Sequence, residues 1–214
     1  MHRWRGRGRP GPRGLDSGML TNDSYELLRL LASPIVAVTS AHDGRTNGMI
    51  LDSAVRSSIS PEHPRLSIYV HKWHVSHELI WASGRFGAHL LNQNQFDLVH
   101  QLGFRSGRHI ADKLADIPHR IGESGVPVLE DCHAAFECRV INTMDAGPAT
   151  LYLGEVVATH AGTSGELLTA DYFRAHLPEA WREEFLKNYR EAQERIRDLA
   201  AVKDVRRWGG PTAP

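Results

Sequence analysis

The chain has 214 residues, of which 41% are hydrophobic and 23% charged, as in a soluble globular protein with one full core. Its 25 Lys and Arg residues balance its 25 Asp and Glu residues, so net charge gives no reason to expect a nucleic-acid or membrane partner. No run of residues approaches the roughly 18–20 apolar residues that span a bilayer. Cys132 and Cys138 are too few for a disulfide framework, so a reduced, cytoplasmic protein is expected.

The beginning of the chain has a different composition from the rest. Residues 1–14 hold five arginines and no acidic residue, among glycines and prolines. Such a segment has little apolar surface to bury, so residues 1–20 are predicted to form a disordered basic tail. A basic arm for nucleic acid is the alternative, whereas a secretory signal would need an apolar segment that does not follow here.

Short elements alternate along the next part of the chain. A polar start followed by leucines at helical spacing predicts a helix over residues 22–33. Residues 34–53 indicate two strands joined by a tight turn at Asp43-Gly44, a pair that tolerates positive φ. A strand is then predicted over 65–73, a helix over 75–84 and a further strand over 85–92.

The second half of the chain contains the longest elements. Residues 93–118 predict a short helix, a glycine-containing connection and another short helical turn. Residues 133–162 predict a long strand pair that turns at 145–148, because apolar and charged residues alternate along it. The period becomes helical from Thr169, and residues 178–202 predict an amphipathic helix with Trp181 on its apolar face.

These elements together favour one class of fold. Many strands joined mainly by hairpins, with helices inserted, indicate an antiparallel β-barrel with added helices. No Gly-x-Gly-x-x-Gly motif follows a strand, which argues against a doubly wound parallel sheet. We therefore expect a mainly β protein with a tail over 1–20, a barrel domain over 21–165 and a helical extension over 166–214.

Residues 71–77 allow two interpretations of a binding site. His71, His74 and His77 recur every third residue and would form a metal site if their rings converged. A change from strand to helix within the segment makes such convergence the weaker interpretation. Lys72 and Ser76 lie with His77 where the strand gives way to a helix, whose N-terminal N–H groups suit a phosphate. The plain alternative is that Ser76 only caps the helix.

A second polar cluster follows the first hairpin, with Asn47, Asp52, Ser53, Ser57 and Ser58 in close succession. Small hydroxyl side chains let a flat ligand approach the strand backbone and meet its N–H and C=O groups. Taken alone, the cluster is equally typical of a polar strand edge.

Five segments follow one another along the chain: SPIVAVTS, NGMILDSAVRSSIS, SHELIWASGRFGAHLLN, PVLEDCHAAFECRV and TLYLGEVV. In this order they resemble the flavin reductase-like family of FMN-binding split barrels. The resemblance runs from about residue 33 to residue 159. It implies a split antiparallel barrel, usually a homodimer, with FMN or sometimes FAD near the dimer interface. Many members reduce flavin with NADH or NADPH and supply a partner monooxygenase. The flavin contacts that the resemblance implies are Asp52, Ser53, Ala54, Val55, Ser57 and Ser58 along the ring and ribityl chain, and Lys72, Ser76 and His77 at the phosphate.

The sequence also departs from the family pattern. Asp52, Ala54 and Val55 replace the common Asn, Phe and Thr, the loop Ser60–Pro64 is longer, and Ala149 stands where many reductases have a histidine. A flavin-binding protein without NAD(P)H turnover therefore stays open, as does a haem or metal protein. No catalytic residue is assigned.

Two further features of the sequence can each be interpreted in two ways. Residues 105–108 read Arg-Ser-Gly-Arg, which suits either contact with a dinucleotide phosphate or a solvated loop. The C-terminal helix suits either packing across a dimer or covering a flavin pocket.

Overall fold

The computed structural model describes residue 31 and residues 34–199, with the side chains of residues 196–199 left aside. The predicted tail over 1–20 and the predicted helix over 22–33 lie outside these residues.

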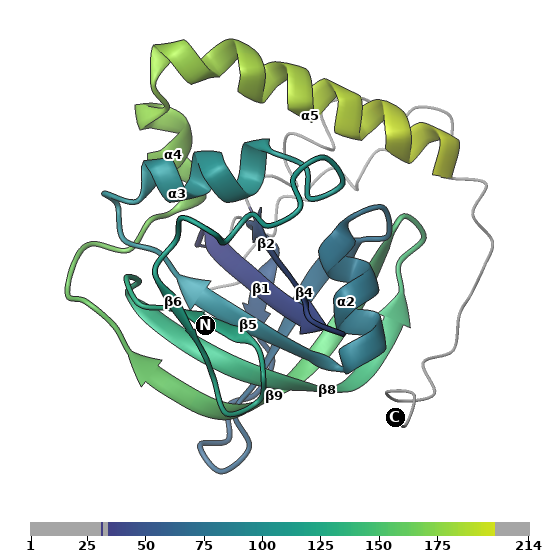
Figure 1. Cartoon of the computed structure of the whole chain (residues 1–214), viewed down its shortest axis with the longest axis vertical. Helices are drawn as coiled ribbons and strands as arrows, with labels where there is room; N and C mark the ends of the chain where they lie inside the picture. Colours follow the sequence, from purple (N-terminus) through teal and green to yellow (C-terminus); the bar gives the residue numbers. More distant parts are fainter. Residues whose placement is uncertain (1–30, 32–33, 200–214) are drawn as a thin grey trace, which may run out of the picture. The chain divides into compact units, whose positions relative to one another are not determined.

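A seven-stranded antiparallel sheet, in the order β2-β1-β5-β8-β9-β4-β3, forms the centre of the structure. It curls into a half-barrel whose two edges are β2 and β3 (Figure 1). The predicted split antiparallel barrel is confirmed. Its strands are β1 (Val36–His42), β2 (Arg45–Leu51), β3 (Ala54–Arg56), β4 (Arg65–His71), β5 (Arg85–Leu90), β8 (Ala134–Asp145) and β9 (Ala149–Ala161).

The predicted hairpins form where the sequence places turn residues. Asp43 and Gly44 both adopt positive φ, 48° and 72°, and join β1 to β2. The hairpin of β8 and β9 turns at residues 146–148. Its register shifts at Glu137/Cys138 and again at Val140/Asn142. Such irregularities bend a strand and increase its twist, which helps the longest strands of the sheet to curl.

One face of the curled sheet encloses the inner core. Val36 and Val38 of β1 point inward and pack in one cluster with Phe86 of β5 and Tyr152 of β9. A Cβ at Gly154 would lie 2.7 Å from Cζ of Phe86, so this glycine makes room for the ring. Helix α2 (Val75–Ser83) contributes Ile80 to the inner core, and Gly84 ends the helix in the left-handed conformation, as predicted.

The opposite face of the sheet carries a second core under the remaining helices. Ala37 of β1, between the two inward valines, belongs to this outer cluster, as the twofold alternation of a strand requires. Leu168 and Phe173 pack there as well. The helices above this face are α3 (Phe96–Val99), the π-helix η1 (His100–Phe104), α4 (Ala170–His176) and α5 (Glu179–Leu199) (Figure 1). None of the described helices is both long and apolar enough to cross a membrane.

The segment after η1 differs from the expected structure. The second helical turn predicted within residues 93–118 is wrong: residues 105–118 form turns and bends. Ile110, Leu114 and Ile117 recur at helical spacing, but Oδ1 of Asp112 accepts the N–H of Leu114, at 2.9 Å, in place of a helical carbonyl. Leu114 and Ile117 reach the outer core. The small hairpin of β6 (His119–Ile121) and β7 (Pro127–Leu129) was not anticipated.

A buried carboxylate attaches that small hairpin to the sheet. Glu137 accepts hydrogen bonds from the backbone N–H of Ser124, at 2.7 Å, and from Nε2 of His160, at 2.7 Å. Nδ1 of His160 in turn accepts from Arg120, at 2.8 Å, which makes this histidine a neutral ring with its proton on Nε2. The hydrogen bonds from Ser124 and His160 hold the pKa of Glu137 below its usual value, despite burial.

Candidate functional site

The N-terminus of α2 opens into a polar cavity of about 410 Å³, called here the α2 cavity. Six parts of the chain surround it: β2, the end of β4, the turn before α2, η1, the loop after η1, and α5. The lining residues are Asn47, Met49, Ile50, His71, Trp73, His74, Val75, Leu102, Gly103, Phe104, Arg105, Ser106, Gly107, Arg108, His109, Lys113, Asn188, Glu191, Ala192 and Arg195.

The start of α2 is suited to an anion. Its N-cap residue, His74, is extended and its side chain makes no capping hydrogen bond. The first N–H groups of a helix have no carbonyl partner within the helix and carry a partial positive charge. Since His74 and Val75 both line the α2 cavity, these groups face a space that can hold a phosphate.

Two of the cationic side chains around the α2 cavity already have partners. Arg108 donates to the carbonyl of Trp73, at 2.8 Å, and to Oε1 of Glu78, at 2.9 Å, and so ties the loop to the turn before α2. Lys113 is buried and donates to the carbonyl of Leu102, at 2.5 Å. Burial lowers its pKa to about 8, so it still carries a positive charge at pH 7.

Two histidines of the cavity lining, His71 and His74, are neutral at pH 7. Burial, with the nearby charges of His71, Lys113 and Arg108, lowers the pKa of His74 to about 4. Burial also lowers the pKa of His71, against a hydrogen bond to the Pro148 carbonyl. His71 and His74 therefore add no positive charge to the α2 cavity, whereas its arginines and its lysine do.

The three histidines do not converge as a metal site requires. The ring centroids of His71 and His74 lie 6.1 Å apart, and His77 is turned away to meet Thr150, with Nε2 and Oγ1 separated by 2.9 Å. Among the described residues, no group of three His, Cys, Asp or Glu side chains is placed to hold an ion.

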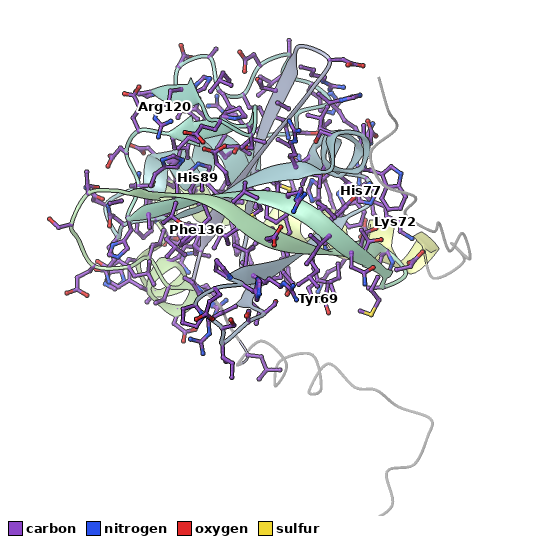
Figure 2. The ribbon with its side chains drawn as sticks, turned by 90° about the horizontal axis from the view of Figure 1, so that it is seen from below. Tyr69, Lys72, His77, His89, Arg120 and Phe136 are labelled. Atoms are coloured by element: carbon purple, nitrogen blue, oxygen red, sulfur yellow. The ribbon has the colours of Figure 1, made fainter. Side chains whose placement is uncertain are left out.

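The residues predicted at the phosphate lie beside the α2 cavity instead of lining it. Nζ of Lys72 binds both carboxylate oxygens of Asp145, each at 2.9 Å. Ser76 is fully buried and its hydroxyl accepts from Asn47, at 2.8 Å. Figure 2 shows Lys72 and His77 at one end of the sheet, apart from His89 and Phe136. The three residues position the turn, while Trp73, His74 and Val75 form its surface toward the cavity.

The predicted flavin-lining segment divides between the surface and a second cavity. Asp52 is exposed. The hydroxyl of Ser53 donates to the Tyr69 carbonyl, at 3.3 Å, and that of Ser57 to the Ser67 hydroxyl, at 2.9 Å, so both serines tie this edge of the sheet to β4. Ala54, Val55 and Ser58 line the second cavity.

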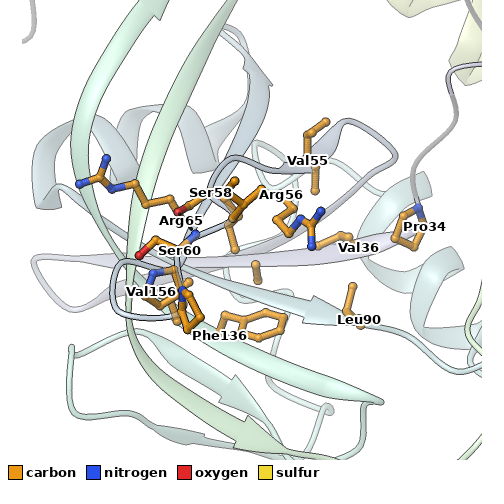
Figure 3. A pocket seen from close by; sticks show the side chains of 16 residues that line it. Pro34, Val36, Val55, Arg56, Ser58, Ser60, Arg65, Leu90, Phe136 and Val156 are labelled. Carbon is orange, nitrogen blue, oxygen red and sulfur yellow. Dashed lines mark hydrogen bonds between the residues drawn. The ribbon is translucent and has the colours of Figure 1, made fainter.

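This second cavity, called here the barrel-mouth cavity, has a volume of about 550 Å³. Figure 3 shows apolar side chains such as Val36, Leu90 and Phe136 around it. The Arg56 side chain extends toward Val36, whereas that of Arg65 extends away from the cavity. Its lining is mainly apolar, with Arg56, Arg65 and two serines, in contrast to the more polar α2 cavity.

The chemistry of the α2 cavity fits a flavin. Uncapped helical N–H groups suit the phosphate, and Met49, Ile50 and Phe104 offer apolar contact to a ring. A Cβ at Gly107 would lie 2.4 Å from Oδ1 of Asn47, so the backbone approaches closely here. The sequence interpretation located the turn before α2 and considered residues 105–108. It did not anticipate Glu191 or Arg195, which reach the cavity from a helix far along the chain.

Comparison with known proteins gives consistent matches. The family described as "Flavin reductase like domain" matches residues 28–179. The ferric-chelate reductase (NAD(P)H) of Archaeoglobus fulgidus is 29% identical over 63% of this chain and 80% of its own. The reductase component of 4-nitrophenol 4-monooxygenase/4-nitrocatechol 2-monooxygenase of Rhodococcus opacus is 30% identical over 67% of this chain and 72% of its own.

One solved structure shares the fold with appreciable identity. It is an FMN-binding protein from Thermus thermophilus with bound 1-cyclohex-2-enone, similar with a TM-score of 0.56 and 27% identity over 75% of this chain and 80% of that chain. This chain covers 63%, 80% and 41% of the lengths of the first three curated relatives that it matches.

Proposed function

The chain belongs to the flavin reductase-like family, and from this membership we propose that it is an NAD(P)H-dependent flavin reductase with its flavin in the α2 cavity. The single observation that supports the location is the uncapped N-terminus of α2 facing a cavity with an excess of positive charge. When bound, the flavin supplies the chemistry of hydride acceptance.

The residues of the α2 cavity bind and orient the flavin in this proposal. The first turn of α2 holds the phosphate, and Arg108 fixes the backbone of that turn through the Trp73 carbonyl. Met49 and Ile50 of β2 and Phe104 of η1 would contact the flavin ring. A phosphate anchor at one end of the ligand limits the positions that the ring can take at the other end.

Ala149 stands where many reductases have a histidine, and this departure from the family pattern bears on the reductase reaction. The structure has another histidine beside Ala149. His71 of β4 lies directly opposite Ala149 of β9 in the sheet register, lines the α2 cavity and stacks on Trp73 with centroids 4.4 Å apart. We propose that His71 orients the nicotinamide against the flavin ring from this strand. His71→Ala would then slow NADH oxidation by a larger factor than it weakens FMN binding.

The test of the proposed function is an anaerobic titration of the purified full chain with FMN, followed by NADH and then NADPH. Loss of the flavin absorption band within seconds of adding either nucleotide is the expected result. Bound FMN that neither nucleotide reduces would contradict the reductase function and favour a flavoprotein without NAD(P)H turnover. Repeating the titration with FAD tests which flavin is preferred.

A homodimer is part of the proposal. The edge strand β3 exposes Val55 (52%), and the loop after it exposes Ile59 (91%), both beside the barrel-mouth cavity. Exposed apolar side chains around an apolar opening are typical of a protein–protein interface. A second copy of this chain on this face would bury them, and light scattering after gel filtration measures the resulting mass.

A monooxygenase that receives reduced flavin is the partner class that we propose. The Rhodococcus relative is by name the reductase component of such a system. The described cysteines, Cys132 and Cys138, are buried and unbonded to each other, which agrees with a reducing cytoplasm as the compartment.

A further inference from the structure

The C-terminal helix α5 forms one wall of the α2 cavity. Asn188, Glu191, Ala192 and Arg195 line it, at helical spacings of three and four residues, so one face of α5 looks into the cavity. The family match ends at residue 179, the first residue of α5. This wall is therefore an addition to the matched family domain.

The same face of α5 has two different characters along its length. Its first half packs on η1: Trp181 stacks on His100 with centroids 4.4 Å apart, and Phe185 contacts Phe104 at 5.7 Å. Asn188 then donates to the Phe104 carbonyl, at 3.1 Å. Beyond this anchor, the edge of the face that borders the cavity carries Glu191 and Arg195. The centre of the face continues in the sequence with Ala192, Ile196 and Leu199.

Two arginines of the α2 cavity have no charged partner. Arg105 and Arg195 form neither a salt bridge nor a side-chain hydrogen bond within residues 34–199, unlike Arg108. They come from the η1 loop and from α5. Glu191 is the one carboxylate among the described lining residues. The cavity wall thus offers two unpaired guanidinium groups to an anion, with a single carboxylate opposing them.

We infer that Arg195 of α5 is a ligand-binding residue of the α2 cavity that recognises the phosphate of the flavin. This inference rests on the proposed function, since it takes the flavin to bind there. Guanidinium groups bind phosphate oxygens through two parallel hydrogen bonds, which adds geometric selectivity to the charge. Arg195 then distinguishes phosphorylated flavin from riboflavin, and Glu191 limits the affinity by opposing the same phosphate.

The experiment measures the dissociation constants of FMN and riboflavin for the full chain by isothermal titration calorimetry. Arg195→Ala is expected to weaken FMN binding about tenfold and to leave riboflavin unchanged. Glu191→Gln is expected to tighten FMN binding about threefold, because it removes a nearby negative charge. Arg190→Ala is the matched control: Arg190 is on the same helix, is exposed, does not line the cavity and bonds only to the Leu186 carbonyl.

Several outcomes would overturn the inference. Equal FMN affinity in Arg195→Ala and Arg190→Ala would show that Arg195 does not contact the ligand. An equal loss of FMN and riboflavin affinity in Arg195→Ala would show that α5 only shapes the cavity. Circular dichroism of each variant shows whether the helix is retained.

A second ligand, ADP, separates this inference from the proposed function. If the wild type binds ADP but not FMN, and Arg195→Ala weakens ADP binding, phosphate recognition stands and the flavin assignment fails. If the wild type binds neither ligand, both fail.

Discussion

The two cavities of this protein are similar in size and opposite in chemistry. The α2 cavity, about 410 Å³, is lined by arginines, histidines and the open end of a helix. The barrel-mouth cavity, about 550 Å³, is lined mainly by aliphatic and aromatic side chains with Arg56 at its side. Volume alone would rank the second as the better ligand site. Charge and available N–H groups are the reasons for proposing the first as the site of an anionic cofactor.

The difference follows from how the two cavities are built. The barrel mouth is the inside of a curled sheet, where alternation sends apolar side chains inward from β1, β5, β8 and β9. The α2 cavity lies where strand ends, a helix start and a loop meet, and such places expose backbone groups that a ligand can satisfy. Four predictions test this contrast, beginning with the largest effect.

Ser106→Glu places a carboxylate in the α2 cavity, next to the proposed phosphate position. It is expected to weaken FMN binding about thirtyfold or more, because two negative groups at one site repel each other. Ser60→Glu makes the same change at the barrel-mouth cavity, where Ser60 is a lining residue, and is expected to leave FMN affinity unchanged. Fluorescence quenching of FMN measures both, and a stronger effect of Ser60→Glu would reverse the assignment of the two cavities.

Ile59→Glu tests the barrel mouth as the contact between two copies. The side chain is 91% exposed, so the substitution has little effect on the fold of one copy and is expected to weaken dimerisation at least tenfold. Ile121→Glu is the matched control, at a 59% exposed position on β6, outside the lining of either cavity. Analytical ultracentrifugation over a concentration series gives the dimer dissociation constant of each variant. Equal dissociation of the two variants would remove the barrel mouth from the interface.

Lys72→Ala and Asp145→Ala test the ion pair that holds the turn before α2 against the β8–β9 turn. Both side chains are largely buried, 19% and 15% exposed, so each substitution is expected to lower the free energy of unfolding by about 2 kcal/mol. If Lys72 also attracts the flavin phosphate, as the sequence predicts, only Lys72→Ala weakens FMN binding. If calorimetry gives the same FMN affinity for the two variants, the role of Lys72 is purely structural.

The parts of the fold that depend on neighbouring residues could be predicted from the sequence. Asp43-Gly44 specifies a hairpin turn locally, Gly84 ends α2, and the alternation through Phe136, Cys138 and Val140 marks a strand. The stretch 105–118 carries Ile110, Leu114 and Ile117 at helical spacing but forms no helix, because its path depends on the docking of Leu114 and Ile117 into the outer core.

The candidate site could be predicted only in part for the same reason. The turn before α2 is visible in the sequence as a lysine and a serine at a strand-to-helix change. The partner of Lys72, however, is Asp145, 73 positions later. Arg195 comes to the α2 cavity because aromatic residues dock the first half of α5 on η1. Contacts at such separations arise from packing, which local sequence patterns do not record.

The last prediction concerns pH and the histidines of the α2 cavity. His71 and His74 lie at the α2 cavity with pKa values lowered by burial, that of His74 to about 4. The unfolded chain, with a histidine pKa of about 6.5, binds more protons than the folded chain between pH 6.5 and 4. Their contribution to stability is therefore present above pH 6.5 and is lost as the pH falls toward 4.

We expect His74→Asn to remove about 2 kcal/mol of this loss, measured by urea unfolding at pH 7.0 and pH 4.5. His109→Asn is the control, since His109 lines the same cavity but is exposed. His89 is also buried, with its pKa lowered to about 4. Because neither variant changes His89, it contributes the same pH dependence of stability to both. An equal pH dependence in the wild type and His74→Asn would mean that His74 is as solvated as a surface histidine, and the α2 cavity would then be more open to water than the structure shows.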